Sequence, residues 1–419
     1  MQALAIIFEV RYGKVQIGLA RASDDADAEN VSAMFEPFPG NYVWNLGVNL
    51  ALIGGGNHGE VDAACRPIRD AAARGADAGS PQFFDSWLAV AEQITANAKI
   101  DEAAGRRWSA AQKYFRASGY YLSAERLQSR DYAPRWEAYR AGLDAFRRHI
   151  ELDGAAVEFV EIPYNETSFP ALFVKAPSST GGPTPAVVSC NGLDSMKEQI
   201  FGNGFAQALA RRGVSTLLVD QPGTGEALRL RGLHGTHESE RWATPAFEYL
   251  AARADVDPSR IGMFGLSLGG YFAPRAAAME PRFALCAIQG ANHDWGEMQK
   301  RRRLREGENP VPHYWDHVMW VFGKSDIEEF MAWAPAMCLD GVVEKIAVPF
   351  LVTHGEADRQ IPVEYAHRSY DQAVNSPQCD LRIFTAKDFE VEHCGADNGT
   401  VGRDFIADWI AERFGGATA

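Results

Sequence analysis

One five-residue segment holds a residue that could act as a nucleophile. Residues 265–269 read Gly-Leu-Ser-Leu-Gly, and a short apolar run precedes them. This pattern is typical of a nucleophile elbow, in which a buried strand ends in a sharp turn carrying a serine and a helix follows. Small residues flank the serine because a side chain two positions away would collide with neighbouring backbone. Ser267 is therefore a candidate nucleophile, and its chemistry requires partners elsewhere in the chain.

The partners expected of such a serine are a histidine and a carboxylate. A serine hydroxyl is barely ionised at neutral pH and needs a base. Histidine titrates in the right range, and a carboxylate fixes its tautomer. Asp358 follows an apolar run at 349–353, and His393 follows the last such run, at 381–384. The chain order Ser267, Asp358, His393 is the order of an α/β-hydrolase triad.

Four other residues compete for these two roles. Glu356 is the alternative acid. His354 and His367 are alternative bases, but the first is expected to pack beside a strand and the second to lie in a helix over 363–374. Asp220 also ends an apolar run, but it is followed by Gln-Pro-Gly-Thr-Gly, which predicts a structural turn.

Attack on a carbonyl also requires two backbone N–H groups that hold the oxyanion. One should belong to Leu268, directly after the nucleophile. The other should come from the loop 191–195, Asn-Gly-Leu-Asp-Ser, which follows an apolar run. We favour Leu193, with Gly192 as the alternative.

Asp194, in the same loop, has two interpretations. It could cap the helix expected from Ser195 onward, a position for which aspartate is well suited. It could instead place its carboxylate beside the reacting carbonyl. The residues alone leave both open.

The elements that must position these residues lie after residue 155. Apolar runs alternate there with helical segments, which predicts a mostly parallel sheet covered by helices on both faces, the α/β class. In such a sheet the chemistry collects at the carboxyl ends of the strands, where each candidate lies. We expect a leading hairpin and six further strands, at 156–161, 171–175, 186–190, 214–220, 261–264, 284–288, 349–353 and 381–384.

The N-terminal part of the chain has a different pattern. Apolar residues recur at three- and four-residue spacing between about 57 and 150, with helices expected over 61–68, 84–91, 103–127 and 136–151. No long period repeats, which argues against a helical-repeat array. A polar link is expected at 21–30, and a small hairpin is expected across 11–13. The predicted domains are an N-terminal segment with a helical cap at 1–150 and an α/β-hydrolase catalytic domain at 151–419.

A lid-like insertion is expected at about 291–343. It is long for a connection and rich in aromatic residues, and such insertions over the carboxyl edge of a sheet are often lids or binding loops. The aromatics could pack the lid on the core or face a planar, bulky substrate. His293, Trp295, Trp315 and Trp320 are the residues that we expect to contact substrate.

Composition narrows the class of protein. The formal net charge of −14 argues against binding to nucleic acid or an anionic membrane. The six cysteines are scattered without metal-site spacing, which fits a reducing cytoplasm. Residues 1–10 lack a basic start, so we expect neither a signal peptide nor a membrane span there. Metal, nucleotide and flavin motifs are absent from the sequence, and no cofactor is expected.

Several motifs together resemble one group of α/β-hydrolases. It is the group of 2,6-dihydroxypseudooxynicotine hydrolase, with the fungal polyketide-shortening hydrolases of pigment synthesis and the FrsA-like esterases as relatives. The likeness covers roughly residue 40 to the end, including Trp44 in the cap. The motifs that carry it are Asn-Gly-Leu-Asp-Ser-Met-Lys-Glu at 191–198, Asp-Gln-Pro-Gly-Thr-Gly-Glu at 220–226, Gly-Leu-Ser-Leu-Gly-Gly-Tyr at 265–271 and Tyr-Phe-Arg-Ala-Ser-Gly-Tyr-Tyr at 114–121.

The resemblance implies a serine-dependent hydrolase that often cleaves a carbon–carbon bond next to a ketone, under a helical cap. Asp194 matches an acidic residue that aids catalysis or substrate positioning in the nicotine-pathway enzyme, but there it is glutamate, so the carboxylate here is one methylene shorter. Trp44 is expected to contact substrate, and a homodimer through the cap is the expected assembly. The alternatives are a carboxylesterase or thioesterase for a bulky ester or lactone, and a non-enzymatic FrsA-like binding protein.

Overall fold

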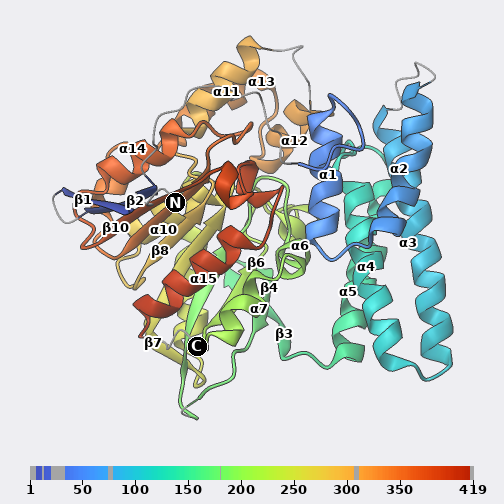
Figure 1. Ribbon diagram of the computed structural model, residues 1–419, viewed down its shortest axis with the longest axis horizontal. Coiled ribbons are helices and arrows are strands. Elements are labelled where there is room, and N and C mark those ends of the chain that lie inside the picture. The colour runs from blue at the N-terminus through green and yellow to red at the C-terminus, as the bar shows by residue number, and fades with distance from the viewer. Residues whose placement is uncertain are drawn as a thin grey trace, which may run out of the picture.

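The computed structural model describes residues 6–11, 14–19, 34–73, 79–179, 181–305 and 311–415. The chain forms a large sheet with helices on both faces, and a bundle of helices stands beside it (Figure 1). The polar link predicted at 21–30 lies outside the described residues. None of the described helices has the length and hydropathy needed to cross a membrane.

The ten strands form one sheet in the order β1-β2-β10-β9-β8-β7-β5-β6-β4-β3. The strands from β2 to β6 in this order are parallel, while β1 at one edge and β4 and β3 at the other are antiparallel to their neighbours. All eight strands predicted after residue 155 are present. The bounds are β1 Ile6–Arg11, β2 Lys14–Leu19, β3 Val157–Tyr164, β4 Thr167–Val174, β5 Thr184–Cys190, β6 Ser215–Val219, β7 Val256–Leu266, β8 Cys286–Gln289, β9 Phe350–Gly355 and β10 Cys379–Phe384.

The N-terminal hairpin has a partner that its sequence did not indicate. The predicted hairpin forms, with β1 antiparallel to β2. In addition, β2 pairs in parallel with β10, so that Val15 lies opposite Asp380 and Gln16 opposite Leu381. The hairpin therefore extends the sheet instead of belonging to the helical region that follows it.

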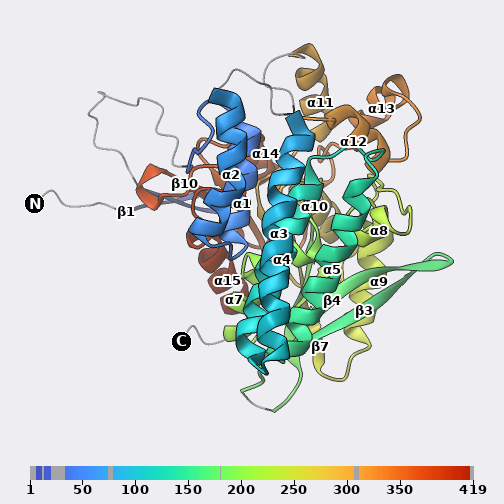
Figure 2. The same cartoon turned by 90° about the vertical axis from the view of Figure 1, so that its right-hand side faces the viewer.

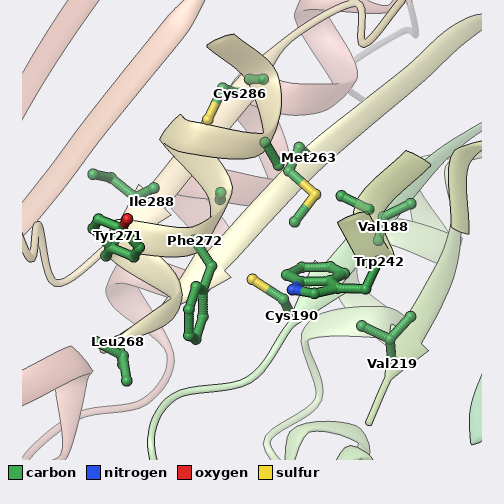
Figure 3. Packing of buried hydrophobic residues seen from close by; sticks show 14 of the residues in the cluster. Val188, Cys190, Val219, Trp242, Met263, Leu268, Tyr271, Phe272, Cys286 and Ile288 are labelled. Atoms are coloured by element: carbon green, nitrogen blue, oxygen red, sulfur yellow. The ribbon is translucent and has the colours of Figure 1, made fainter. Parts of the chain in front are cut away.

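Both faces of the central strands are buried, as expected of a parallel sheet. Val188 faces one cluster of apolar side chains and its neighbour Val187 faces another. Figure 3 shows the first cluster, where Trp242 and Phe272 pack over the strands. Helices α9, α10 and α14 cover this face, and α7 and α15 cover the other. Their bounds are α7 Phe205–Arg211, α9 Glu240–Ala251, α10 Gly269–Met279, α14 Glu364–Gln372 and α15 Val401–Arg413.

Five helices form the region beside the sheet (Figure 2). The helix predicted at 103–127 is present as α4 but begins only at Arg107, because Gly105 adopts a left-handed conformation (φ +72°) between α3 and α4. Aromatic and alanine side chains fill the core of this region. The bounds are α1 Tyr42–Ile53, α2 His58–Ala73, α3 Gly79–Ala103, α4 Arg107–Arg126 and α5 Pro134–Asp153.

A buried ion cluster joins the helical region to the sheet region. Glu125 at the end of α4 accepts hydrogen bonds from Arg135 of α5 and from Arg229 of α8 (Gly225–Arg229). All three side chains are at most 1% exposed. Charges buried to this extent persist only when they are paired, so the cluster fixes where α4 lies on the sheet region.

The insertion after β8 consists of short helices rather than an open loop. They are α11 Trp295–Leu304, α12 Tyr314–Val321 and α13 Ile327–Trp333, which lie along one end of the sheet (Figure 1). A short antiparallel bridge between Asp294 and Cys338 closes the base of the insertion. Helix α12 contacts the helical region, since Trp320 packs edge-on against Trp136 at 5.9 Å between ring centroids.

Candidate active site

The serine segment has the geometry of a nucleophile elbow. Strand β7 ends at Leu266, α10 begins at Gly269, and Ser267 between them has φ +60°. A side chain on Gly265 would overlap the backbone of Gly269, and one on Gly269 would approach the carbonyl oxygens of Cys190 and Asn191 to 3.2 Å. The two glycines are thus required by close packing around a strained serine.

The structure brings the predicted histidine and aspartate to this serine. His393 Nε2 lies 2.8 Å from Ser267 Oγ, and His393 Nδ1 lies 2.8 Å from Asp358 Oδ2. The other oxygen of Asp358 accepts hydrogen bonds from the backbone N–H groups of Gln360 and Ile361, at 2.7 and 2.9 Å. The Asp358 carboxylate therefore has a fixed orientation. The proton on His393 lies on Nδ1, which donates a hydrogen bond to this carboxylate.

Burial and charge act in opposite directions on this pair. Burial would raise the pKa of Asp358, but the charge of His393 and its hydrogen bonds hold that pKa below its ordinary value. Burial would likewise lower the pKa of His393, but the Asp358 carboxylate outweighs this effect and raises the pKa well above the ordinary 6.5. The imidazolium form is thus strongly favoured by its partner.

In the described part of the chain the competing residues make no hydrogen bond to Ser267, although His354 Nε2 lies 3.5 Å from Asp358 Oδ2. His354 is buried at the end of β9, where Nδ1 accepts from the N–H of Ala291 and Nε2 donates to the carbonyl of Ile361. His367 is exposed on α14, and Glu356 accepts a hydrogen bond from a backbone N–H near the surface. Asp220 is fully buried and has the structural role expected of it.

Asp220 holds two loops next to the site. It accepts hydrogen bonds from Asn191 Nδ2 at 3.2 Å, from the N–H and Nζ of Lys197 at 2.8 and 3.0 Å, and from the N–H of Glu226 at 2.8 Å. Lys197 begins the short helix α6, Lys197–Gly202. These bonds fix the loop 191–195 in front of Ser267.

That loop offers the backbone donors expected for an oxyanion. Its Gly192 lies against the serine, since a Cβ there would be 2.9 Å from Ser267 Cβ and 3.3 Å from its Oγ. The N–H of Gly192 is already used by Ser195 Oγ, at 2.9 Å. Within the described residues the N–H groups of Leu193 and Leu268 have no acceptor. This arrangement favours Leu193 over Gly192 as the second donor.

Asp194 does not cap a helix. Helix α6 starts at Lys197 with Met196 in the cap position and no side-chain cap bond. Instead, Asp194 Oδ2 accepts a hydrogen bond from Nε of Arg126 at 2.9 Å, and Nη2 of the same guanidinium forms an ion pair with this oxygen at 2.8 Å. Arg126 is the last residue of α4, so this ion pair joins the loop to the helical region. No local sequence pattern indicates a partner so distant along the chain.

A cavity opens between the helical region and the sheet region beside this ion pair. Its wall is mainly apolar and comes from α1, α4, α6 and the start of α15. Asp194 and Arg126 line it, and so do Leu266 and Cys394, the neighbours of Ser267 and His393 in the sequence. Cys394 Sγ lies 3.6 Å from His393 Nε2. The cavity therefore lies next to the candidate reacting groups, although Ser267 and His393 are not among its lining residues.

The five residues predicted to contact substrate do not line this cavity. His293 is fully buried, and its ring nitrogens contact Ser369 Oγ at 2.9 Å and Asp340 Oδ1 at 3.1 Å. Trp44 packs against Phe38 and Phe83 inside the helical region. For these two residues the geometry indicates packing and structural hydrogen bonding.

The three tryptophans of the insertion pack against aromatic or cationic neighbours. Trp295 is buried against Phe322 and Phe330, and Trp315 packs on Tyr314. Trp320 lies under the guanidinium of Arg135 at 5.3 Å. Sequence alone could not tell a lid aromatic that faces the core from one that faces a substrate, because both uses have the same spacing.

One further contact from the helical region reaches the candidate acid. Tyr42, the first residue of α1, accepts a hydrogen bond from Gln360 Nε2 at 3.2 Å, next to Asp358. Burial is the main cause that raises the Tyr42 pKa to about 12, so its hydroxyl stays protonated. Among the described residues no cluster of His, Cys, Asp and Glu is arranged to hold a metal ion, and none of the six cysteines forms a disulfide bond.

The sheet order, with the elbow at the end of β7 and the histidine after the last strand, defines the α/β-hydrolase fold. A solved structure of 2,6-dihydroxy-pseudo-oxynicotine hydrolase superposes with a TM-score of 0.68 and 21% identity, covering 87% of this chain and 95% of that chain. Sequence comparison finds Hydrolase LUC6 of Fusarium sp, 29% identical over 82% of this chain and 90% of the relative. It also finds the 2,6-dihydropseudooxynicotine hydrolase of Paenarthrobacter nicotinovorans, 25% identical over 78% of this chain and 83% of the relative.

Family profiles agree with these likenesses. The prolyl oligopeptidase family matches residues 203–416, and the esterase FrsA-like family matches residues 82–303. Each match spans about half of the sequence. The chain belongs to the prolyl oligopeptidase and FrsA-like esterase families of α/β-hydrolases, and it is a hydrolytic enzyme.

Proposed function

We propose that the protein is a serine hydrolase with Ser267 as nucleophile, His393 as base and Asp358 as the orienting carboxylate. The observation that carries this proposal is the continuous chain of two 2.8 Å hydrogen bonds that ends on a serine in a strained turn. We propose further that α1 to α5 act as a cap over the site, since both Arg126 and Tyr42 reach it from these helices.

The geometry supports the following reaction as part of this proposal. His393 Nε2 takes the proton of Ser267 Oγ as this oxygen attacks the carbonyl carbon of the substrate. The N–H groups of Leu193 and Leu268 hold the oxyanion of the tetrahedral intermediate. The leaving group departs with the proton from His393. Water then loses a proton to His393 and hydrolyses the acyl-enzyme, which regenerates the Ser267 hydroxyl.

For the substrate, we propose an aromatic or polyketide-like ketone whose carbon–carbon bond next to the carbonyl is hydrolysed. Such a cleavage expels a carbanion, so the substrate must itself stabilise it as an enolate or an electron-rich aryl ring. Asp194 would orient the hydroxyl groups of such a substrate beside the carbonyl. A mainly apolar cavity next to Asp194 suits this class of molecule, and the hydrolase of Paenarthrobacter nicotinovorans is a relative over most of the chain.

A carboxylesterase or thioesterase acting on a bulky ester or lactone is the second candidate. It is favoured by the match of residues 82–303 to the esterase FrsA-like family. The same serine, histidine and oxyanion donors serve ester cleavage, and no electron sink in the substrate is then needed.

Two experiments test the proposal. A fluorophosphonate probe should label the wild type and leave Ser267→Ala unlabelled, and equal labelling of the two proteins would contradict the nucleophile. Turnover of aryl 1,3-diketones should then be compared with turnover of simple aryl esters. Rapid hydrolysis of the esters alone would exclude carbon–carbon cleavage and leave the esterase.

A further inference from the structure

The ion pair between Arg126 and Asp194 leaves one carboxylate oxygen free. Both contacting nitrogens of Arg126 lie against the same oxygen, Oδ2: Nε donates a hydrogen bond at 2.9 Å, and Nη2 lies 2.8 Å away in the ion pair. Oδ1 makes no hydrogen bond to any described residue. The Arg126 side chain is 12% exposed, whereas that of Asp194 is 33% exposed. Asp194 is thus the partner of this ion pair with more open space around its side chain.

That open space is the cavity beside the candidate reacting groups. Asp194 and Arg126 line it together with Leu266 and Cys394, which flank Ser267 and His393. The rest of the wall is mainly apolar, with Leu50 and Phe115 from the helical region among its residues. A molecule that reacts at Ser267 and extends into this cavity would therefore lie against the side chain of Asp194.

The surrounding charges keep that oxygen an acceptor. Burial would raise the pKa of Asp194, but the charges of Arg126, His317 and Arg229 hold it below its ordinary value. Tyr314 also faces the carboxylate, and its own pKa is raised, chiefly by burial. These four groups come from α4, α12 and α8. An ionised carboxylate only accepts hydrogen bonds, so its ligand must donate one.

We propose that Arg126 is a positioning residue that turns Asp194 toward the cavity, where Asp194 Oδ1 recognises a hydroxyl group on an otherwise apolar substrate. A hydroxyl suits the site better than an ammonium group, because the neighbouring guanidinium groups already balance the carboxylate and most of the remaining wall is apolar. The inference deepens the proposed function, on which it rests for the position of the reacting carbonyl.

If the ion pair of Arg126 and Asp194 only held α4 in place, the orientation of the Asp194 carboxylate would not matter. The buried cluster of Glu125 with Arg135 and Arg229 already joins α4 to the sheet region close to the same loop. The ion pair of Arg126 is less buried and ends on a loop residue that faces the cavity. The contribution of Arg126 is therefore to orient the Asp194 carboxylate and to keep it ionised.

The test measures binding rather than turnover, so it does not depend on the proposed reaction. The probes are benzoylacetone and its ortho, meta and para hydroxyphenyl derivatives, bound to Ser267→Ala protein and followed by tryptophan fluorescence. The variants in this background are Arg126→Gln and Arg126→Lys. Arg116→Gln is the matched control, because Arg116 also lies in α4 and pairs with a carboxylate, Glu60, away from the cavity.

We expect the best hydroxyl derivative to bind at least tenfold more tightly than benzoylacetone, the range for a hydrogen bond to a charged group. Arg126→Gln should reduce this ratio to below about threefold, Arg126→Lys should restore part of it, and Arg116→Gln should leave it unchanged. Lowering the pH should abolish the preference at a higher pH in Arg126→Gln than in the parent, because the Asp194 pKa rises without its partner.

Several results would overturn the proposal. These are a preference below tenfold in the parent protein, binding of none of the probes, or an Arg126→Gln variant that keeps both the preference and its pH dependence. An equal loss in Arg116→Gln would also overturn it, since the effect would then be general to α4. Failure of fluorophosphonate labelling would refute the proposed nucleophile and leave these binding results unaffected.

Discussion

Replacing Glu125 by glutamine should destabilise the protein strongly. Arg135 and Arg229 would then lose the carboxylate that balances their charges inside the protein. Glu125 is fully buried and accepts hydrogen bonds from Arg135 at 2.9 Å and from Arg229 at 2.8 and 3.1 Å. The glutamine keeps the shape of the side chain and removes its charge. The change therefore isolates the electrostatic contribution of the cluster.

The loss of unfolding free energy can be estimated in two ways, from the shifted pKa of Glu125 and from the usual cost of breaking a buried ion pair. Burial acts to raise the Glu125 pKa, but the two arginines lower it from 4.5 to about 2. At 1.36 kcal/mol per pKa unit this corresponds to about 3 kcal/mol of stability. Breaking a buried ion pair by removing one partner costs about 3–5 kcal/mol. We therefore expect Glu125→Gln to lower the free energy of unfolding by about 3–5 kcal/mol.

Urea unfolding followed by circular dichroism measures the effect, with Glu151→Gln as control. Glu151 pairs with Arg148 on the surface, where such a pair is worth about 1 kcal/mol or less. The folded-state pKa of Glu125 is depressed, so its contribution is present above pH 4.5 and is lost as the pH falls toward about 2. A Glu125→Gln variant as stable as the control variant would refute the reasoning.

Three further predictions concern the site. Asp358→Asn should lower kcat on any aryl ester that the protein hydrolyses by roughly 10⁴-fold, because His393 loses the partner that sets its tautomer; unchanged kcat would exclude this role. The rate of fluorophosphonate labelling should rise with pH through a midpoint above 6.5, since the base must be neutral and Asp358 raises the pKa of His393; a midpoint below 6.5 would contradict the pairing. Gly265→Ala should lower the thermal unfolding midpoint, because its methyl group overlaps the Gly269 backbone, whereas Gly59→Ala, which meets no atom within 4 Å, should not.

The sheet and the three candidate reacting residues were predictable because their determinants are local. Most of the apolar strands stand between helical segments, and the elbow, the aspartate and the histidine each lie beyond the carboxyl end of a strand. In a parallel sheet these strand ends meet at one edge, so chain order alone brings Ser267, Asp358 and His393 together. The break between α3 and α4 also has a local cause, the left-handed Gly105.

The helical region's contribution to the site was not predictable, since it depends on how two regions pack. Arg126 meets Asp194, and Tyr42 meets Gln360, across large separations in sequence. No periodicity encodes such contacts. The role of Trp295 in the insertion was not predictable either, because an aromatic side chain is equally suited to a core and to a ligand. Trp295 lies in the core.

The pairing of β2 with β10 makes the order of synthesis a constraint on folding. The N-terminal hairpin leaves the ribosome early, but its partner Asp380–Leu381 is among the last parts of the sheet to be made. Until then β2 carries an unsatisfied backbone edge, which is the kind of surface that joins other chains. The nascent protein therefore depends on late, non-local closure, and slow translation of its C-terminal part should favour aggregation over folding.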